Sequence, residues 1–182
     1  MILPIYIYGQ TVLNLPGEEI KPNTLPLDKI IPDMFESMYA AGGIGLAAHQ
    51  VGFPIKLFIV DISHYASGDE SLKTFKKVFI NSEIIEEGEE EKESNEGCLS
   101  FPGLHLDIKR KTKIKLRYLD ENFIQHEEWF DGLAARCILH EHDHTQGLLF
   151  IKKIHPLRRR LIESKLKDII KGNFSTNYKY IL

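Results

Sequence analysis

Two histidines four residues apart, His140 and His144, lie in a segment whose pattern predicts an α-helix over residues 131–146. In a helix these side chains lie about 40° apart around the axis and about 6 Å apart along it, so both imidazoles can bind one ion. Glu141 lies about 60° from His144, close enough to contact a molecule bound to that ion without being a ligand. The spacing therefore predicts a metal-binding helix of the kind that zinc hydrolases use.

The same helix has recognisable ends. Asp131 can cap its first turn, and Gly147 favours the left-handed conformation that ends a helix. His142 lies on the side of the helix opposite His140, so we expect it to face solvent.

A metal site needs a third protein ligand, which this motif does not supply. In a chain with 8 histidines, chance occurrence of H-E-x-x-H is on the order of a few per cent, so an ordinary amphipathic helix is the alternative. Cys98, in the segment 96–100, is a candidate ligand, because one cysteine with two histidines leaves a position of a tetrahedral site open for water. A buried structural thiol is the alternative for Cys98, and it is our interpretation of Cys137.

The stretch from Gly43 to Gln50 formally matches the glycine-rich fingerprint of dinucleotide-binding proteins. That fingerprint requires a strand before the glycines and a helix after them, whereas here a predicted helix comes first and a strand follows. The glycines instead permit close approach of a ligand to the backbone. Gln50 offers an amide donor to a carbonyl group, with a structural glutamine in a tight turn as the alternative.

Composition and charge restrict the class of protein further. The 182 residues are 43% hydrophobic and 27% charged, with a net charge of −3, which is typical of a soluble domain and argues against DNA as a partner. No stretch approaches the roughly 18 apolar residues of a membrane span, and the N-terminal residues do not resemble a secretory signal. We therefore expect a cytoplasmic protein with reduced cysteines and no membrane partner.

The hydrophobic pattern predicts one α+β domain over residues 1–182, with mixed or antiparallel sheets packed around the metal-binding helix and a C-terminal helix. No repeat or linker divides the chain. The predicted helices are residues 27–40, 131–146 and 156–171, the predicted strands are 56–62, 78–81, 83–87 and 111–120, and residues 172–182 are expected to be a loose tail.

Three motifs together carry a resemblance to a known family. GIGLAAHQ at 43–50, EGCLS at 96–100 and HEHDH at 140–144 resemble, in order and spacing, the three signature motifs of the peptide deformylases. The similarity covers most of the chain, and the C-terminal helix is like that of one bacterial subtype. The family removes the formyl group from nascent polypeptides that begin with N-formylmethionine.

The resemblance implies a role for each matching residue. The implied metal ligands are Cys98, His140 and His144, the implied acid/base is Glu141, and the implied oxyanion donors are Gln50 and the backbone N–H of Leu99. It also implies one ferrous ion per chain, although Zn, Ni or Co also suit this ligand set and can occupy it in purified protein.

The reaction expected from this resemblance is hydrolysis of a formamide. A divalent ion activates water and polarises the formyl oxygen, Glu141 takes the proton of the water, and the products are formate and a peptide with a free amino-terminal methionine. The segment Gly43, Ile44 and Gly45 is expected to bind the substrate, because it can pair with an extended peptide as a strand would.

The sequence departs from the family pattern at three positions. Leu139 stands where glutamine is common, Gly42 where an acidic residue is common, and His105 where some members have arginine. None of these is an implied ligand or the base, so activity is expected to survive. Arg110 matches a family arginine, and the sequence leaves open whether it pairs with Asp143 or lies exposed.

Two alternatives to this function remain at the level of sequence. A zinc peptidase would use the same helix with a downstream carboxylate such as Glu163 as third ligand, and a catalytically inactive module would hold the metal only for structure. The last predicted helix carries Arg158, Arg159, Arg160, Lys165 and Lys167. In similar proteins this helix docks on the ribosome, and an exposed, solvated face is the alternative.

Overall fold

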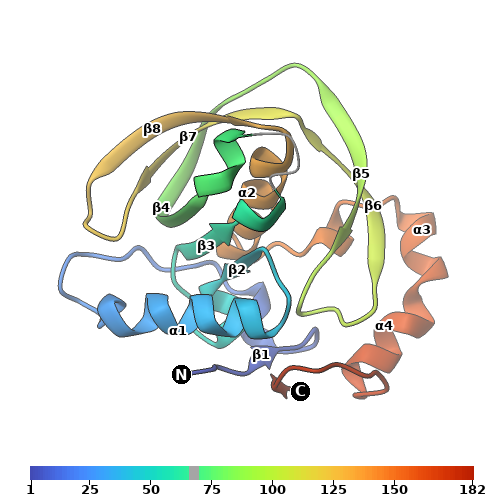
Figure 1. Cartoon of the computed structure of the whole chain (residues 1–182). Coiled ribbons are helices and arrows are strands. Elements are labelled where there is room, and N and C mark those ends of the chain that lie inside the picture. Colours follow the sequence, from blue (N-terminus) through green and yellow to red (C-terminus); the bar gives the residue numbers. More distant parts are fainter. Residues whose placement is uncertain (66–69) are drawn as a thin grey trace.

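Figure 1 shows the computed structural model of the chain, which describes residues 1–65 and 70–182. The helices are α1 Leu27–Ala40, α2 Gly132–Thr145, α3 Pro156–Leu161 and α4 Glu163–Ile170. The strands are β1 Ile5–Tyr6, β2 Gly45–Ala47, β3 Leu57–Asp61, β4 Lys76–Glu87, β5 Glu91–Gly97, β6 His105–Lys111, β7 Lys113–Leu119, β8 Gln125–Asp131 and β9 Tyr180–Ile181. Short 3-10 helices span Thr11–Asn14, Ala48–Val51, Ser63–Tyr65, Glu70–Thr74 and Phe150–Lys152.

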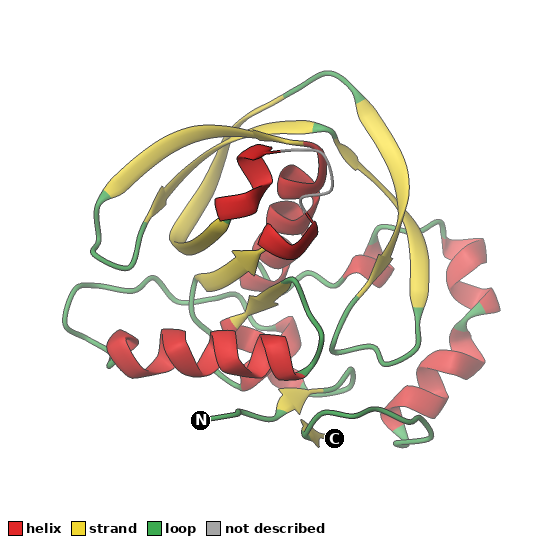
Figure 2. Ribbon diagram, viewed as in Figure 1, coloured by secondary structure: helices red, strands yellow, loops and turns green. Residues whose placement is uncertain are grey.

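Within the described ranges the strands form three sheets (Figure 2). The largest is antiparallel, with five strands in the order β2-β3-β4-β7-β8. Strands β5 and β6 form a separate antiparallel pair, and β1 pairs with β9 in parallel. The predicted fold class, α+β with mixed and antiparallel sheets, is therefore confirmed. None of the helices in the described ranges combines the length and the apolar character needed to cross a membrane.

Helix α2 lies at the centre of the molecule, between the large sheet and the β5–β6 pair (Figure 1). Its buried face carries Ala134, Ala135 and Ile138, which belong to one hydrophobic cluster with Phe58 and Phe79 of the sheet. Small alanine side chains let the sheet approach the helix closely. This packing fixes the rotation of α2, and with it the direction in which the histidine face points.

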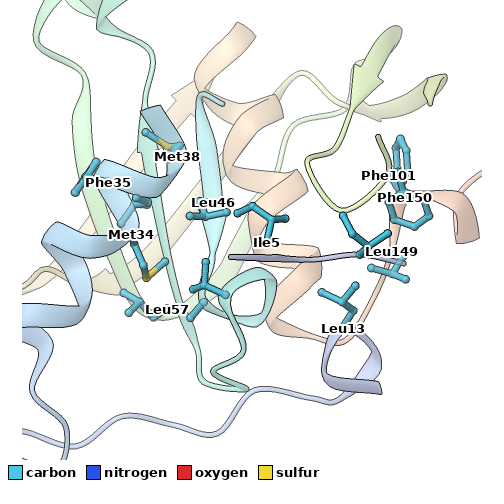
Figure 3. Packing of buried hydrophobic residues seen from close by; sticks show 14 of the residues in the cluster. Ile5, Leu13, Met34, Phe35, Met38, Leu46, Leu57, Phe101, Leu149 and Phe150 are labelled. Carbon is cyan, nitrogen blue, oxygen red and sulfur yellow. The ribbon is translucent and has the colours of Figure 1, made fainter. Parts of the chain in front are cut away.

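Strand β3 separates two hydrophobic clusters. Successive side chains of a strand point to opposite faces, so Leu57 and Ile59 belong to one cluster, while Phe58 and Val60 belong to the cluster around α2. Figure 3 shows the first cluster, whose labelled members are Ile5, Leu13, Met34, Phe35, Met38, Leu46, Leu57, Phe101, Leu149 and Phe150. Every residue of β3 is buried, which explains why its first four residues are a continuous apolar run rather than an alternating one.

Most elements predicted from periodicity are present. Helix α1 has the predicted bounds and continues through Pro32. Helix α2 matches the predicted helix with Asp131 and Gln146 as its caps, although the Asp131 side chain makes no capping hydrogen bond. The predicted strands 78–81 and 83–87 are one strand, β4, whose register with β7 shifts between Ile80 and Glu83. Strands β5, β6 and β8 are not among the predicted elements.

The C-terminal region differs from the prediction in two ways. The expected helix 156–171 is broken at Ile162 into α3 and α4. The expected loose tail is instead held against the fold, because β9 pairs with β1 and the N–H groups of Ile5 and Ile7 bind the carbonyls of Lys179 and Ile181, each within 2.9 Å. The tail is held in place because it supplies the strand that satisfies the backbone of β1.

Candidate metal centre and active site

The three predicted metal ligands converge at one place. His140 and His144 come from α2, and Cys98 comes from the turn that follows β5. One side-chain ligand atom from each residue lies within 4.8 Å of those of the other two, and Cys98 Sγ is 3.4 Å from His144 Nε2. This donor set and spacing suit one divalent ion with an open coordination position. Glu163, the third ligand of the peptidase alternative, is not part of this group.

Gln50 is fixed beside the cysteine. Its side chain is buried, and Oε1 accepts a hydrogen bond of 2.9 Å from the backbone N–H of Ala47. Its Nε2 donates to Cys98 Sγ at 3.4 Å and to Ser100 Oγ at 3.3 Å. The structure therefore brings this predicted residue next to the ligand group, with its amide at the wall of the cavity.

Glu141 is buried beside the ligands and only partly satisfied. The residue is 5% exposed, and its Oε2 has no hydrogen-bond partner among the described residues. Burial raises the pKa of Glu141 to about 7. The carboxylate lies directly against the backbone of Gly45, where a Cβ atom would come within 2.6 Å of Oε1. Only glycine leaves room for the carboxylate at this position.

A buried ion network that the sequence did not reveal supports His140. Glu96 accepts a hydrogen bond at 3.0 Å from Nδ1 of His140, and it is also paired with Arg110 and Arg136 at 2.7 Å each. Burial opposes ionisation of Glu96, but the hydrogen bonds from His140 and Arg110 outweigh it and lower its pKa to about 2. A carboxylate behind a ligating histidine fixes the orientation of the ring.

Arg110 joins this network to α2. It is 4% exposed, and its Nη1 binds Asp143 Oδ2 at 2.7 Å. The alternative left open by the sequence is therefore decided in favour of the buried pair. The position of Glu96, two residues before Cys98, was the available signal for a supporting carboxylate.

A cavity of about 460 Å³ opens beside the ligand group. The predicted substrate segment, residues 43–45, lies in the wall of this cavity. In the part of the chain that the structure describes, the strand β2 that begins at Gly45 is an edge of the large sheet. The lining residues that bear on function are Gly43, Ile44, Gly45, Gln50, Cys98, Leu99, His105, Leu133, Cys137, His140, Glu141 and Tyr178. Tyr178, from the segment predicted to be loose, was missed by the sequence analysis.

The remaining predicted positions have mixed outcomes. His142 is not exposed to solvent as expected, because it is half-buried and its Nδ1 lies 2.9 Å from Ser82 Oγ of β4. Among the departures from the family pattern, Leu139 is buried in the cluster around α2, and Gly42 and His105 line the cavity. None of these three contributes an atom to the ligand group.

A cysteine and two histidines at the wall of a cavity, with a buried carboxylate beside them, form the arrangement of a metal-dependent hydrolase. Residues 2–160 match the polypeptide deformylase family. The chain belongs to this family.

Full-length relatives and solved structures agree with this assignment. The peptide deformylase of Flavobacterium johnsoniae is 44% identical, covering 98% of this chain and 95% of the relative, and that of Cytophaga hutchinsonii is 40% identical, covering 98% and 96%. The crystal structure of a peptide deformylase from Legionella pneumophila has a TM-score of 0.82 and 33% identity, covering 95% of this chain and 98% of that one. The structure of the Ehrlichia chaffeensis enzyme in complex with actinonin has a TM-score of 0.84 and 32% identity, covering 96% and 99%.

The predicted activity is thereby confirmed. The chain is a hydrolase that removes the N-formyl group from nascent polypeptides, and its family is metal-dependent.

Proposed function

We propose that Cys98, His140 and His144 hold one divalent ion and that Glu141 is the acid/base of formyl removal. The convergence of three ligand atoms within 4.8 Å carries this proposal. A buried carboxylate oxygen of Glu141 without a partner among the described residues supports it, because such atoms ordinarily bind a ligand or a water.

The native ion in this proposal is Fe(II). A thiolate with two imidazoles also suits Zn, Ni and Co, and a thiolate-bound ferrous ion is prone to oxidation, so another metal is expected in protein purified in air. Anaerobic purification followed by metal analysis and a formate-release assay tests this identity. Full activity with zinc alone, and none with iron, would contradict it.

When bound, the ion supplies Lewis acidity for a formamide carbonyl and for water. Glu141 takes the proton of the attacking water and returns it to the nitrogen of the departing peptide. The amide of Gln50 and the backbone N–H of Leu99 donate hydrogen bonds to the oxygen that becomes negative. One such donor is typically worth about 3 kcal/mol of transition-state stabilisation.

The substrate in this proposal is a nascent formyl-methionyl polypeptide. Gly43, Ile44 and Gly45 bind its backbone as an added strand, because they precede and begin the edge strand β2 and line the cavity. Leu133 and Cys137 lie on the same face of α2 as His140 and line the same cavity. Their apolar side chains are suited to the methionine side chain.

A peptide assay with one substitution tests the catalytic assignment. Glu141→Ala should retain its metal and lose about 10²-fold or more of its turnover of a formyl-methionyl peptide, as expected when a general base is removed. Normal turnover of this variant would refute the acid/base role. Cleavage of internal peptide bonds by the wild type would favour the peptidase alternative.

The same proposal places the enzyme in the cytoplasm, at the ribosome. Helix α3 exposes the row Arg158, Arg159 and Arg160, together with Leu157 at 62% and Leu161 at 85% exposure. Exposed apolar side chains among arginines suit a partner that presents both phosphate and apolar surface.

A further inference from the structure

The turn that carries Cys98 and Leu99 has each of its first three carbonyl groups bound by a different part of the chain. The Cys98 carbonyl accepts from the N–H of Phe101 at 2.9 Å, which closes the turn locally. The Leu99 carbonyl accepts from the hydroxyl of Tyr178 at 2.7 Å, and the Ser100 carbonyl accepts from the N–H of Tyr8 at 2.9 Å. Two of these three bonds therefore come from the N- and C-terminal segments.

The two segments hold each other in place. Tyr178 lies two residues before Tyr180, which pairs in parallel with Ile5. The chain continues from β1 to Tyr8, whose ring stacks on Phe101 with centroids 4.7 Å apart. The N- and C-terminal segments thus both contact the turn while they pair with each other, and Figure 1 shows β1 and the two chain ends close together.

We infer that Tyr178 is a positioning residue for deformylation. Leu99 lies between two peptide groups: one contains its own N–H and the Cys98 carbonyl, and the other contains its own carbonyl. The Phe101 N–H fixes the first group and the Tyr178 hydroxyl fixes the second. The hydroxyl therefore restrains the backbone that presents the Cys98 thiolate and the Leu99 N–H to the cavity, which Tyr178 also lines. This inference rests on the proposed function, in which Cys98 is a ligand and Leu99 a donor.

The inference predicts a selective defect in the variant Tyr178→Phe, which keeps the ring and removes only the hydroxyl. Its kcat should fall about three- to tenfold, the range for loss of one neutral hydrogen bond. Its KM should stay unchanged, because among the described residues the hydroxyl donates to Leu99 and forms no hydrogen bond with the substrate segment 43–45. In the metal-loaded protein, hydrogen–deuterium exchange of the amides in residues 97–101 should become several-fold faster.

Tyr180→Phe is the matched control. It removes a hydroxyl from the same tail, the side chain is 42% exposed, and that hydroxyl has no hydrogen bond to the described residues. This variant should match the wild type in kcat and in exchange. An equal defect in both variants would mean general loosening of the tail, and unchanged kcat and exchange in Tyr178→Phe would mean that the bond restrains nothing; either result overturns the inference.

Glu141→Ala, assayed in the same series, separates this inference from the proposed function. If Glu141→Ala loses turnover while Tyr178→Phe keeps the kcat and the exchange rates of the wild type, only the positioning role is overturned. Full turnover in Glu141→Ala overturns the acid/base assignment alone, because the positioning role rests on Cys98 and Leu99 and is decided by the Tyr178→Phe and Tyr180→Phe pair.

Discussion

At the scale of single residues, the site depends on how closely the backbone approaches the carboxylate of Glu141. Gly45 is in contact with this carboxylate, and a methyl group there would lie within 2.6 Å of Oε1 and 2.9 Å of Cγ. The carboxylate is buried, so it has little room to move aside. The position of the Glu141 carboxylate is therefore set by a residue in β2 as much as by its own helix.

Gly45→Ala should consequently reduce turnover by at least about tenfold while the metal content stays the same, since it displaces the proposed base Glu141 and not the proposed ligands. Formate release and metal analysis measure the two quantities. Gly88→Ala is the control, because its added Cβ would come no nearer than 3.2 Å to Lys113, and neither residue is among those that line the cavity. A Gly45→Ala enzyme with normal turnover would show that Glu141 has more freedom than the packing indicates.

His49 makes the stability of the protein depend on pH. It is fully buried, its Nε2 lies 3.1 Å from the Leu15 carbonyl, and burial lowers its pKa to about 4. The unfolded chain has the ordinary value near 6.5, so it binds the proton first as the pH falls. Stability from this group is therefore present above pH 6.5 and is lost between about 6.5 and 4.

Between pH 7 and pH 5 this linkage should remove about 2 kcal/mol from the free energy of unfolding. In His49→Gln, which cannot titrate, the fall over the same interval should be smaller by that amount. Urea denaturation at several pH values measures both proteins. Parallel pH profiles would contradict the assignment of a neutral, buried histidine.

The sequence predicted which residues meet at the site because they lie in short linear motifs. It did not predict the ion network of Glu96, Arg110 and Arg136, because charged residues in sequence look alike whether they are exposed or buried in pairs. The prediction that His142 faces solvent was wrong for a related reason. Helical geometry shows which side of α2 the residue is on, but not that Ser82 of β4 lies against that side.

At the scale of elements, charged strands account for most of the missed structure. Strands β5 and β6 pair from Glu91–Lys111 to Gly97–His105, yet most of their side chains are charged or polar, so no apolar alternation marks them. Strand β8 is similar. Helix α1 was predicted closely because its buried apolar residues recur at helical spacing. Helix α2 was predicted from the residues at its ends, Asp131 and Gly147, and from the spacing of its histidines. The break between α3 and α4 at Ile162 could not be predicted, because no glycine or proline lies there in the sequence.

The link between β6 and α2 should matter for stability. Arg110→Met removes the guanidinium that Glu96 and Asp143 share and leaves both carboxylates buried. Loss of one partner from a buried ion pair typically costs 3–5 kcal/mol, and we expect about 3 kcal/mol here, because Lys153 still lies 3.1 Å from Asp143. Urea denaturation measures the change.

Arg117→Met is the control for that experiment. Arg117 also pairs with a carboxylate at 2.7 Å, that of Glu127, but the pair is solvent-exposed. Its loss should cost much less than the loss of Arg110, because water screens an exposed ion pair. Similar losses in the two variants would mean that burial adds nothing to the Arg110 pair.

At the scale of the whole molecule, the two ends of the chain meet. The β1–β9 contact joins Ile5 to Tyr180, and no sequence pattern predicts a pairing of two short strands across nearly the entire chain. The tail is thus part of the site wall through Tyr178. Truncation after Ile154 would therefore remove this support as well as α3 and α4, so charge reversal tests ribosome binding more cleanly.

Ribosome binding should depend on the basic face of α3. The double variant Arg159→Glu/Arg160→Glu should weaken salt-sensitive binding to ribosomes at least tenfold in a sedimentation assay, because these exposed arginines lie on that face. Lys21→Glu/Lys29→Glu changes the net charge equally at exposed positions elsewhere and should bind as the wild type does. Equal weakening in the two double variants would indicate a net-charge effect, not docking by α3.

The central claim is that one sulfur and two imidazole nitrogens hold the ion. X-ray absorption spectroscopy of the anaerobically purified protein measures these ligands directly. We predict one sulfur neighbour at about 2.3 Å with two imidazoles, and loss of the sulfur signal in Cys98→Ser, which still contains Cys137. A metal shell without sulfur in the wild type, or one that keeps its sulfur in Cys98→Ser, would contradict the account.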